Sequence, residues 1–267
     1  MENDPYQDSM KFVSGITDSG KHKSEITVED ITHLFDGAFS HFNASIKINS
    51  GNIPPESMRL NQWSGEESFL SLMKKYQDSY YGDNELKPNQ KGLYSLWSQW
   101  YFGLVVPPMM LMLLAYPQAV DTDYHLFQIE FHETGRPNII YYQLTWLDEP
   151  ISLLSRYQIM LDRHIIPVCD KIESYRGINK RLLWNNIGYV MHWYLNNFKD
   201  RVDKSQYDTL IQHLFFEQTL PDGRDNPLYR TVIMKNNAIQ RRCCCQRNKL
   251  PGVSNCHDCP LGTTKEK

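Results

Sequence analysis

The chain has 267 residues, which is long enough to bury a substantial core as one large domain or two smaller ones. Hydrophobic residues make up 41% of it and charged residues 22%, which is ordinary for a globular protein in water. The net charge of -3 excludes a strong overall attraction to nucleic acid or to an anionic membrane.

The sequence does not predict a membrane protein. Residues 1–25 form a polar arm, and their acidic start, MENDPYQDSMKF, does not match a secretory signal. The longest apolar stretch, residues 104–116, is interrupted by Pro107-Pro108 and is shorter than the roughly 20 residues that span a bilayer. We therefore predict no transmembrane segment and a cytoplasmic location, with peripheral association at the inner membrane left open.

Residues 26–120 are predicted to form a mostly helical N-terminal region. Thr27 and Asp30 resemble a capping box, so we expect a helix over residues 27–42. Residues 44–65 are rich in Ser, Asn, Gly and Pro and are predicted mainly as loop.

Helical spacing returns after this loop. A helix over 67–81 has an apolar face made of Phe69, Leu70, Leu72, Met73 and Tyr76. A further helix is expected over 92–103. Pro107-Pro108 suits the first turn of a helix, so we predict that a separate helix starts there and ends near Tyr116.

Residues 121–267 are predicted to form an α+β C-terminal region. The alternation of apolar and polar residues on both sides of ETGRPN, residues 133–138, is typical of a β-hairpin. The fold class is therefore α+β, mostly helical, with a small antiparallel sheet or hairpin and a C-terminal segment rich in cysteine. The remaining elements are helices over 150–174, 179–199 and 204–216, a loop over 220–230, and an extended run over 230–240.

Five of the six cysteines lie within the 17 positions from Cys243 to Cys259. Their spacing is C-C-x10-C-x2-C from Cys244 to Cys259, with Cys243 left over. A C-x2-C pair followed by Pro is a frequent metal-binding turn. In a reducing cytosol, such clustering indicates metal or redox chemistry rather than structural disulfides.

The spacing alone leaves the metal open. One zinc ion is more often held by two C-x2-C pairs, whereas two iron centres accept ligands that leave a Cys-Cys pair in different directions. The pattern therefore favours a [2Fe-2S] cluster over structural zinc, and it departs from the ferredoxin spacings. A thiol-disulfide or persulfide role is a third alternative. Cys169 is expected to be a buried packing residue.

The cysteine motif at 244–259 resembles the ferric-siderophore reductases of the FhuF type. The run RRCCCQRNKLP at 241–251 is similar to the family segment, and GRDNPLYR at 223–230 and LLWNN at 182–186 show a weaker likeness. The resemblance implies a [2Fe-2S] cluster and one-electron reduction of Fe(III) bound by a siderophore of hydroxamate type. It places the cluster ligands at Cys244, Cys245, Cys256 and Cys259.

The implied reaction needs an external electron donor, because the sequence contains no dinucleotide or phosphate-binding motif. A ferredoxin or a ferredoxin reductase fits that role, and nucleic acid is not an expected partner. The main alternative function is a non-enzymatic binding module in which zinc holds the C-terminus to the helical body. His257 lies inside the C-x2-C pair and is either near the cluster or an exposed loop residue.

Basic and aromatic residues supply the other candidate site residues. Four basic residues lie near the cysteines in the sequence: Arg241, Arg242, Arg247 and Lys249. They could tune the reduction potential of the cluster or bind an acidic electron donor. The alternative is that they form only a solvated basic face. A siderophore also needs a broad pocket with aromatic walls. The candidates are Arg163, Trp184, Tyr189 and Arg230, together with Trp193 and Tyr194 on the helix over 179–199, although such an aromatic stripe is more often core.

Overall fold

The computed structural model describes residues 26–82, 87–116, 119–147, 150–175, 178–235, 238–256 and 259–261. The N-terminal arm and His257 lie outside the described residues. The mostly helical α+β class is confirmed. The α-helices are α1 (Val28–Leu34), α2 (His41–Ser45), α3 (Leu60–Trp63), α4 (Glu66–Tyr81), α5 (Gln90–Ala115), α6 (Leu153–Met160), α7 (Ile166–Glu173), α8 (Lys180–Phe198) and α9 (Lys204–Ile211).

Two small sheets accompany the helices. The hairpin predicted around ETGRPN is confirmed: β2 (Phe127–Phe131) pairs antiparallel with β3 (Pro137–Tyr142). β1 (Ile46–Ile48) adds to the other side of β3 as a parallel strand and gives the order β1-β3-β2. The extended run after residue 230 is a second antiparallel pair, β4 (Val232–Lys235) with β5 (Ala238–Arg241).

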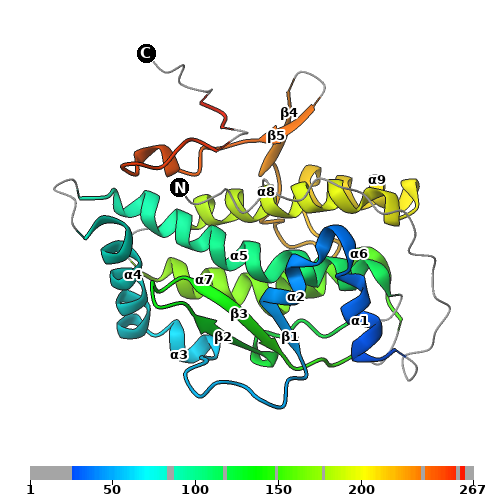
Figure 1. The fold of residues 1–267 in the computed structure, drawn as a ribbon. Helices are drawn as coiled ribbons and strands as arrows, with labels where there is room; N and C mark the ends of the chain where they lie inside the picture. Colours follow the sequence, from blue (N-terminus) through cyan, green and yellow to red (C-terminus); the bar gives the residue numbers. More distant parts are fainter. Residues whose placement is uncertain are drawn as a thin grey trace.

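The helix α5 runs through the centre of the molecule. In Figure 1 the three-stranded sheet lies on one side of it, and the β4–β5 hairpin with the C-terminal segment lies on the other. By length and composition α5 would also suit a membrane span, but 67% of its most apolar 18-residue window is buried inside the fold. It packs against α8 as the core helix of the body.

The prediction of two helices around Pro107-Pro108 is wrong, because α5 continues through both prolines. Proline lacks the N–H that would bond the carbonyl four residues earlier, so the helix loses two backbone hydrogen bonds here. Residues 105–113 are almost all buried, including Val105, Val106 and Leu111. Their packing on every side keeps the chain helical where the local preference would end it.

The first helix is shorter than predicted. The capping box is confirmed, since the Asp30 N–H donates to Thr27 Oγ1 at 3.1 Å and the Thr27 N–H donates to Asp30 Oδ2 at 2.8 Å. However, α1 ends at Leu34, and Gly37 starts a 3-10 turn with a φ of 65°. That left-handed conformation favours glycine and turns the chain toward α2.

Two other expectations are met only in part. Residues 44–65 are mainly loop, as predicted, but they also contain β1 and α3, elements too short to give a periodic signal. On α4, Phe69, Leu72 and Met73 are buried as predicted, whereas Leu70 is 44% exposed. The apolar face of α4 is therefore narrower than the sequence suggested.

The helical stretches predicted over 150–174 and 204–216 each contain one π-helical turn, at Leu161–Ile165 and Gln212–Phe216. Asn226 closes the second of these turns. Its Nδ2 donates to the carbonyls of His213 at 3.0 Å and Glu217 at 2.9 Å. The side chain thus satisfies carbonyl groups that a helix end leaves without partners. Cys169, on α7, is fully buried, which confirms its packing role.

Candidate metal centre

Residues 241–256, which we call the cysteine segment, pack against the first turns of α5. Gly92 makes this approach possible, because a Cβ there would lie 2.9 Å from the backbone oxygen of Gln246 and 3.2 Å from the side chain of Leu250. Leu250 is buried against the core. Ser95, one turn further along α5, donates its hydroxyl to the Cys245 carbonyl at 2.6 Å. The segment is therefore fixed to the body at two points, Cys245 and Leu250.

Two of the predicted ligands already lie at a metal-compatible distance. The sulfurs of Cys245 and Cys256 are 4.0 Å apart, and two thiolates on one tetrahedral ion with metal–sulfur bonds of 2.3 Å lie about 3.8 Å apart. The Cys259 N–H donates to the Cys256 carbonyl at 3.1 Å and closes the turn of the C-x2-C pair. Cys244 receives a hydrogen bond from the Gln246 N–H at 3.3 Å.

The thiols influence one another's ionisation. A hydrogen bond from the Cys256 thiol, helped by the nearby Arg241 guanidinium, lowers the pKa of Cys245 to about 5 although burial opposes this. The same shared proton raises the pKa of Cys256 well above its usual range. Burial raises the pKa of Cys244, and Cys245 and Cys259 add to that shift. The lowered pKa favours the thiolate form of Cys245, and a bound cation would favour deprotonation of the neighbouring thiols.

Arg241 is the charged group most deeply placed in this site. Its side chain is 3% exposed. Its Nη2 donates to Asn186 Oδ1 at 2.7 Å, its Nη1 lies 3.8 Å from Cys256 Sγ, and its guanidinium stacks 4.5 Å from the Tyr189 ring centroid. Among the described residues no carboxylate pairs with it, and its buried Nε has no hydrogen-bond partner.

A buried cation needs a nearby negative charge to offset the cost of desolvation. The cysteines beside Arg241 can supply it as thiolates, so the buried guanidinium fits an anionic, thiolate-ligated centre. Within the described ranges no group of three His, Cys, Asp or Glu side chains is placed to hold a metal ion. The Cys245–Cys256 pair is the part of the ligand set closest to a metal-binding arrangement, and its sulfur chemistry fits zinc and iron alike.

The other basic residues are less buried than Arg241. Arg242 donates through Nη1 to the Arg230 carbonyl at 3.3 Å. Arg247 is half-buried and contributes to the low pKa of Cys245. Lys249 is exposed. Arg241 is therefore placed where it could change the reduction potential of a metal centre. Arg242 and Lys249 are placed nearer the surface, where they could contact a partner protein.

The four candidates for siderophore contact do not form one pocket wall. Arg163 pairs with Asp121 at 2.9 Å. Trp184 is buried, and Tyr189 lies under the Arg241 guanidinium. Arg230 adopts a φ of 54° at the turn before β4, where its carbonyl binds Arg242. Tyr189 and Arg230 therefore border the cysteine segment, and Trp184 belongs to the core.

Sequence reasoning missed two buried polar residues beside the cysteines, Ser95 and Asn186. Asn186 Nδ2 donates to Ser95 Oγ at 2.9 Å, and its Oδ1 receives the bond from Arg241 described above. These contacts join α5, α8 and the cysteine segment in one buried network. Asn186 lies in the LLWNN run noted for its family likeness, but its position at the network was not evident without the fold.

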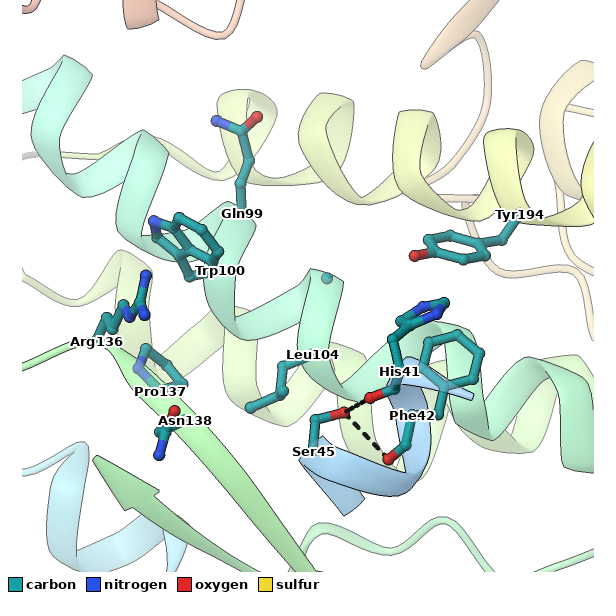
Figure 2. A pocket seen from close by; sticks show the side chains of 11 residues that line it. His41, Phe42, Ser45, Gln99, Trp100, Leu104, Arg136, Pro137, Asn138 and Tyr194 are labelled. Atoms are coloured by element: carbon teal, nitrogen blue, oxygen red, sulfur yellow. Dashed lines mark hydrogen bonds between the residues drawn. The ribbon is translucent and has the colours of Figure 1, made fainter. Parts of the chain in front are cut away.

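A cavity of about 210 Å³ opens between α2, α5, β3 and α8 (Figure 2). Gln99 lines it and lies one helical turn from Ser95, to whose carbonyl its Nε2 donates at 3.1 Å. Of the predicted aromatic residues, Tyr194 belongs to its wall. The cavity therefore borders the same buried network as the cysteines.

Comparisons with known proteins decide the family. Residues 95–239 match the profile of the family described as "Ferric iron reductase FhuF-like transporter". The ferric siderophore reductase of Escherichia coli (strain K12) is 39% identical over 216 residues, which cover 78% of this chain and 80% of that protein. The chain belongs to the FhuF-like ferric iron reductase family. The resemblance seen in the sequence is thereby confirmed, while the profile match ends before the cysteines.

A solved structure also overlaps part of this FhuF-like fold. It is the aerobactin synthetase IucC from a hypervirulent pathotype of Klebsiella pneumoniae, with a TM-score of 0.48 and 10% identity. The overlap covers 67% of this chain and 37% of that chain, so this protein spans little more than a third of the synthetase. No functional statement follows from a likeness at this level.

Proposed function

We propose that this FhuF-like protein reduces Fe(III) bound by a hydroxamate siderophore, through a [2Fe-2S] cluster held by Cys244, Cys245, Cys256 and Cys259. The observation that carries the proposal is the buried Arg241 guanidinium, which faces the cysteine sulfurs and is paired with no described carboxylate. The name of the Escherichia coli relative and the family description support the reductase class.

When bound, such a cluster supplies one electron at a time. The cysteine thiolates would hold it at the edge of the body, and Arg241 would offset the negative charge that increases on reduction. One electron converts the Fe(III) chelate to the Fe(II) chelate, and an external donor of the ferredoxin or ferredoxin-reductase class restores that electron. Fe(II) suits hard oxygen ligands less well, so the siderophore releases it. We place this reaction in the cytoplasm.

A single-turnover assay tests the proposal. The anaerobically purified protein is reduced with dithionite, freed of excess reductant, and mixed with a ferric trihydroxamate and a colorimetric Fe(II) chelator. We expect about one Fe(II) released per reduced cluster, accompanied by the return of the oxidised visible spectrum. A protein that takes up electrons but releases no Fe(II), or that carries zinc and takes up none, would contradict the proposal; the second result would favour the zinc-held binding module.

A further inference from the structure

The cavity between α2, α5, β3 and α8 combines aromatic walls with hydrogen-bond donors and acceptors. Phe42 and Trp100 provide apolar surface, and the Arg136 guanidinium lies 5.0 Å above the Trp100 ring centroid. Figure 2 shows Arg136 and Asn138 on one side of the opening and Tyr194 on the other. Ligand sites in proteins have this character: mostly apolar walls with a few well-placed polar groups.

The two prolines of α5 give this cavity an additional feature. A helical N–H at position 107 would bond the Gly103 carbonyl, and one at 108 would bond the Leu104 carbonyl. Pro107 and Pro108 have no N–H, so neither carbonyl receives its regular helical bond. Gly103 and Leu104 both line the cavity, and Gly103, which has no side chain, lines it with its backbone. The cavity therefore borders a stretch of α5 in which two backbone carbonyls lack their regular helical N–H donors.

The cavity is also linked to the candidate metal centre through side chains. Gln99 lines it and bonds to the Ser95 carbonyl at 3.1 Å, and Ser95 in turn bonds to the Cys245 carbonyl at 2.6 Å. Four residues, a rise of about 6 Å, separate Gln99 from Ser95 along α5. A molecule that contacts Gln99 would therefore be connected to the Cys245 carbonyl through two hydrogen bonds.

We propose that this cavity, which we call the proline pocket, binds the organic part of a ferric hydroxamate chelate. Hydroxamate siderophores present methylene chains, amide N–H groups and carbonyl oxygens. The methylene chain matches the aromatic walls, the amide N–H matches the Gly103 and Leu104 carbonyls, which lack their regular helical donors, and oxygen acceptors match Arg136. This inference rests on the proposed reductase function and assigns it a substrate site.

The size of the pocket defines how much of the chelate it takes. Pockets that enclose a drug-sized ligand measure about 300–1,000 Å³, and this one measures about 210 Å³. One arm of the siderophore enters, and the iron-bearing part remains at the mouth. Recognition of one arm rather than the whole chelate makes the site tolerant of several hydroxamate siderophores.

Binding of a redox-inert chelate tests the pocket without requiring electron transfer. The probe is gallium(III) desferrioxamine B, whose metal is not reduced, titrated into the full protein by calorimetry. We expect Leu104→Trp, which fills the pocket, to weaken binding at least about tenfold, and Arg136→Gln to weaken it less. The control is Leu70→Trp on the exposed side of α4, outside the pocket lining, which should bind as the natural protein does.

The outcomes separate the pocket from the reductase function. Equal affinity for the natural protein and Leu104→Trp, with Arg136→Gln also unchanged, would overturn the pocket, and so would absence of binding by the natural protein. If Leu104→Trp weakens gallium binding while the natural protein releases no Fe(II), the pocket is supported and the reductase function fails. If Leu104→Trp releases Fe(II) at the natural rate under subsaturating ferric chelate, the pocket fails and the function stands.

Discussion

The helical body and the cysteine segment are held in different ways. The body, residues 26–235, is built around an apolar core, in which α5 and α8 contribute most of the long buried stretches. The cysteine segment contributes few apolar groups to that core, chiefly Leu250. It is attached mainly by polar contacts, such as Ser95 to Cys245 and Arg241 to Asn186.

This difference indicates that the two parts depend on different chemistry. Burial of apolar surface is the main stabilising contribution in the body. The segment has too little of it, so binding of a metal centre by the thiolates would supply the missing stability, because ligation energy becomes folding energy. Changes at the cysteines should therefore affect the segment while leaving the body folded.

The largest expected effect comes from the ligands. Cys256→Ser removes the partner that lies 4.0 Å from the Cys245 sulfur and should abolish the metal centre. Cys243→Ser, the matched control in the same cysteine run, should leave it nearly intact. Visible absorption and iron content measure the centre, and circular dichroism should show an unchanged helical body in both variants. Retained absorption in Cys256→Ser, or its loss in Cys243→Ser, would overturn the ligand assignment.

Gly92→Ala should separate the segment from α5. The new methyl would meet the Gln246 backbone oxygen at 2.9 Å and the Leu250 side chain at 3.2 Å, and overpacking of this kind costs about 1–3 kcal/mol. We expect faster loss of metal to a chelator, while the body keeps its helical content. Gly51→Ala is the control, because nothing lies within 4 Å of a Cβ there. Equal rates of metal loss in the two variants would argue against the close packing of the segment.

Arg241→Gln tests whether the buried charge tunes the centre. Without the guanidinium, the extra electron on the reduced centre is less well stabilised, so the potential should become more negative. A tenfold weaker stabilisation of the reduced state corresponds to a shift of about 59 mV. Arg241→Lys keeps the charge and should give a smaller shift. Potentiometric titration followed by absorption measures both variants. A potential unchanged in Arg241→Gln would mean that the guanidinium has only a structural role.

The smallest expected effect is that of Ser95→Ala. This variant removes the donor to the Cys245 carbonyl and leaves a buried acceptor without its partner, at a cost of about 1–3 kcal/mol. Metal retention against a chelator should fall moderately. Ser98→Ala is the matched control: Ser98 is also buried on α5, but its hydroxyl bonds to the Ser95 carbonyl within the same helix. A larger effect at Ser98 would contradict the role of Ser95 as the anchor of the segment.

The sequence predicted the elements that have a strong local signal. The capping box at Thr27 and the β2–β3 hairpin have such signals, and both are present. The break expected at Pro107-Pro108 did not occur, because burial around the prolines outweighs their local preference. Tertiary packing of that kind is not visible in a short window of sequence.

For the site, spacing and family likeness proposed the cysteines and the neighbouring basic residues. They could not show that Arg241 is buried against Cys256 while Lys249 is exposed, because both lie in one basic run. Nor could they place Ser95, which is 150 positions from Cys245 in the chain and meets it only through the packing of α5. Long-range contacts of this kind are set by the fold rather than by local sequence.

The most direct test of the central claim is analysis of iron, acid-labile sulfide and zinc in protein purified under anaerobic conditions, with a visible spectrum before and after dithionite. The account predicts about two irons and two sulfides per chain, with bands that bleach on reduction. One zinc per chain, no sulfide and no colour would contradict it, and would leave the cysteine segment as a structural attachment of the C-terminus.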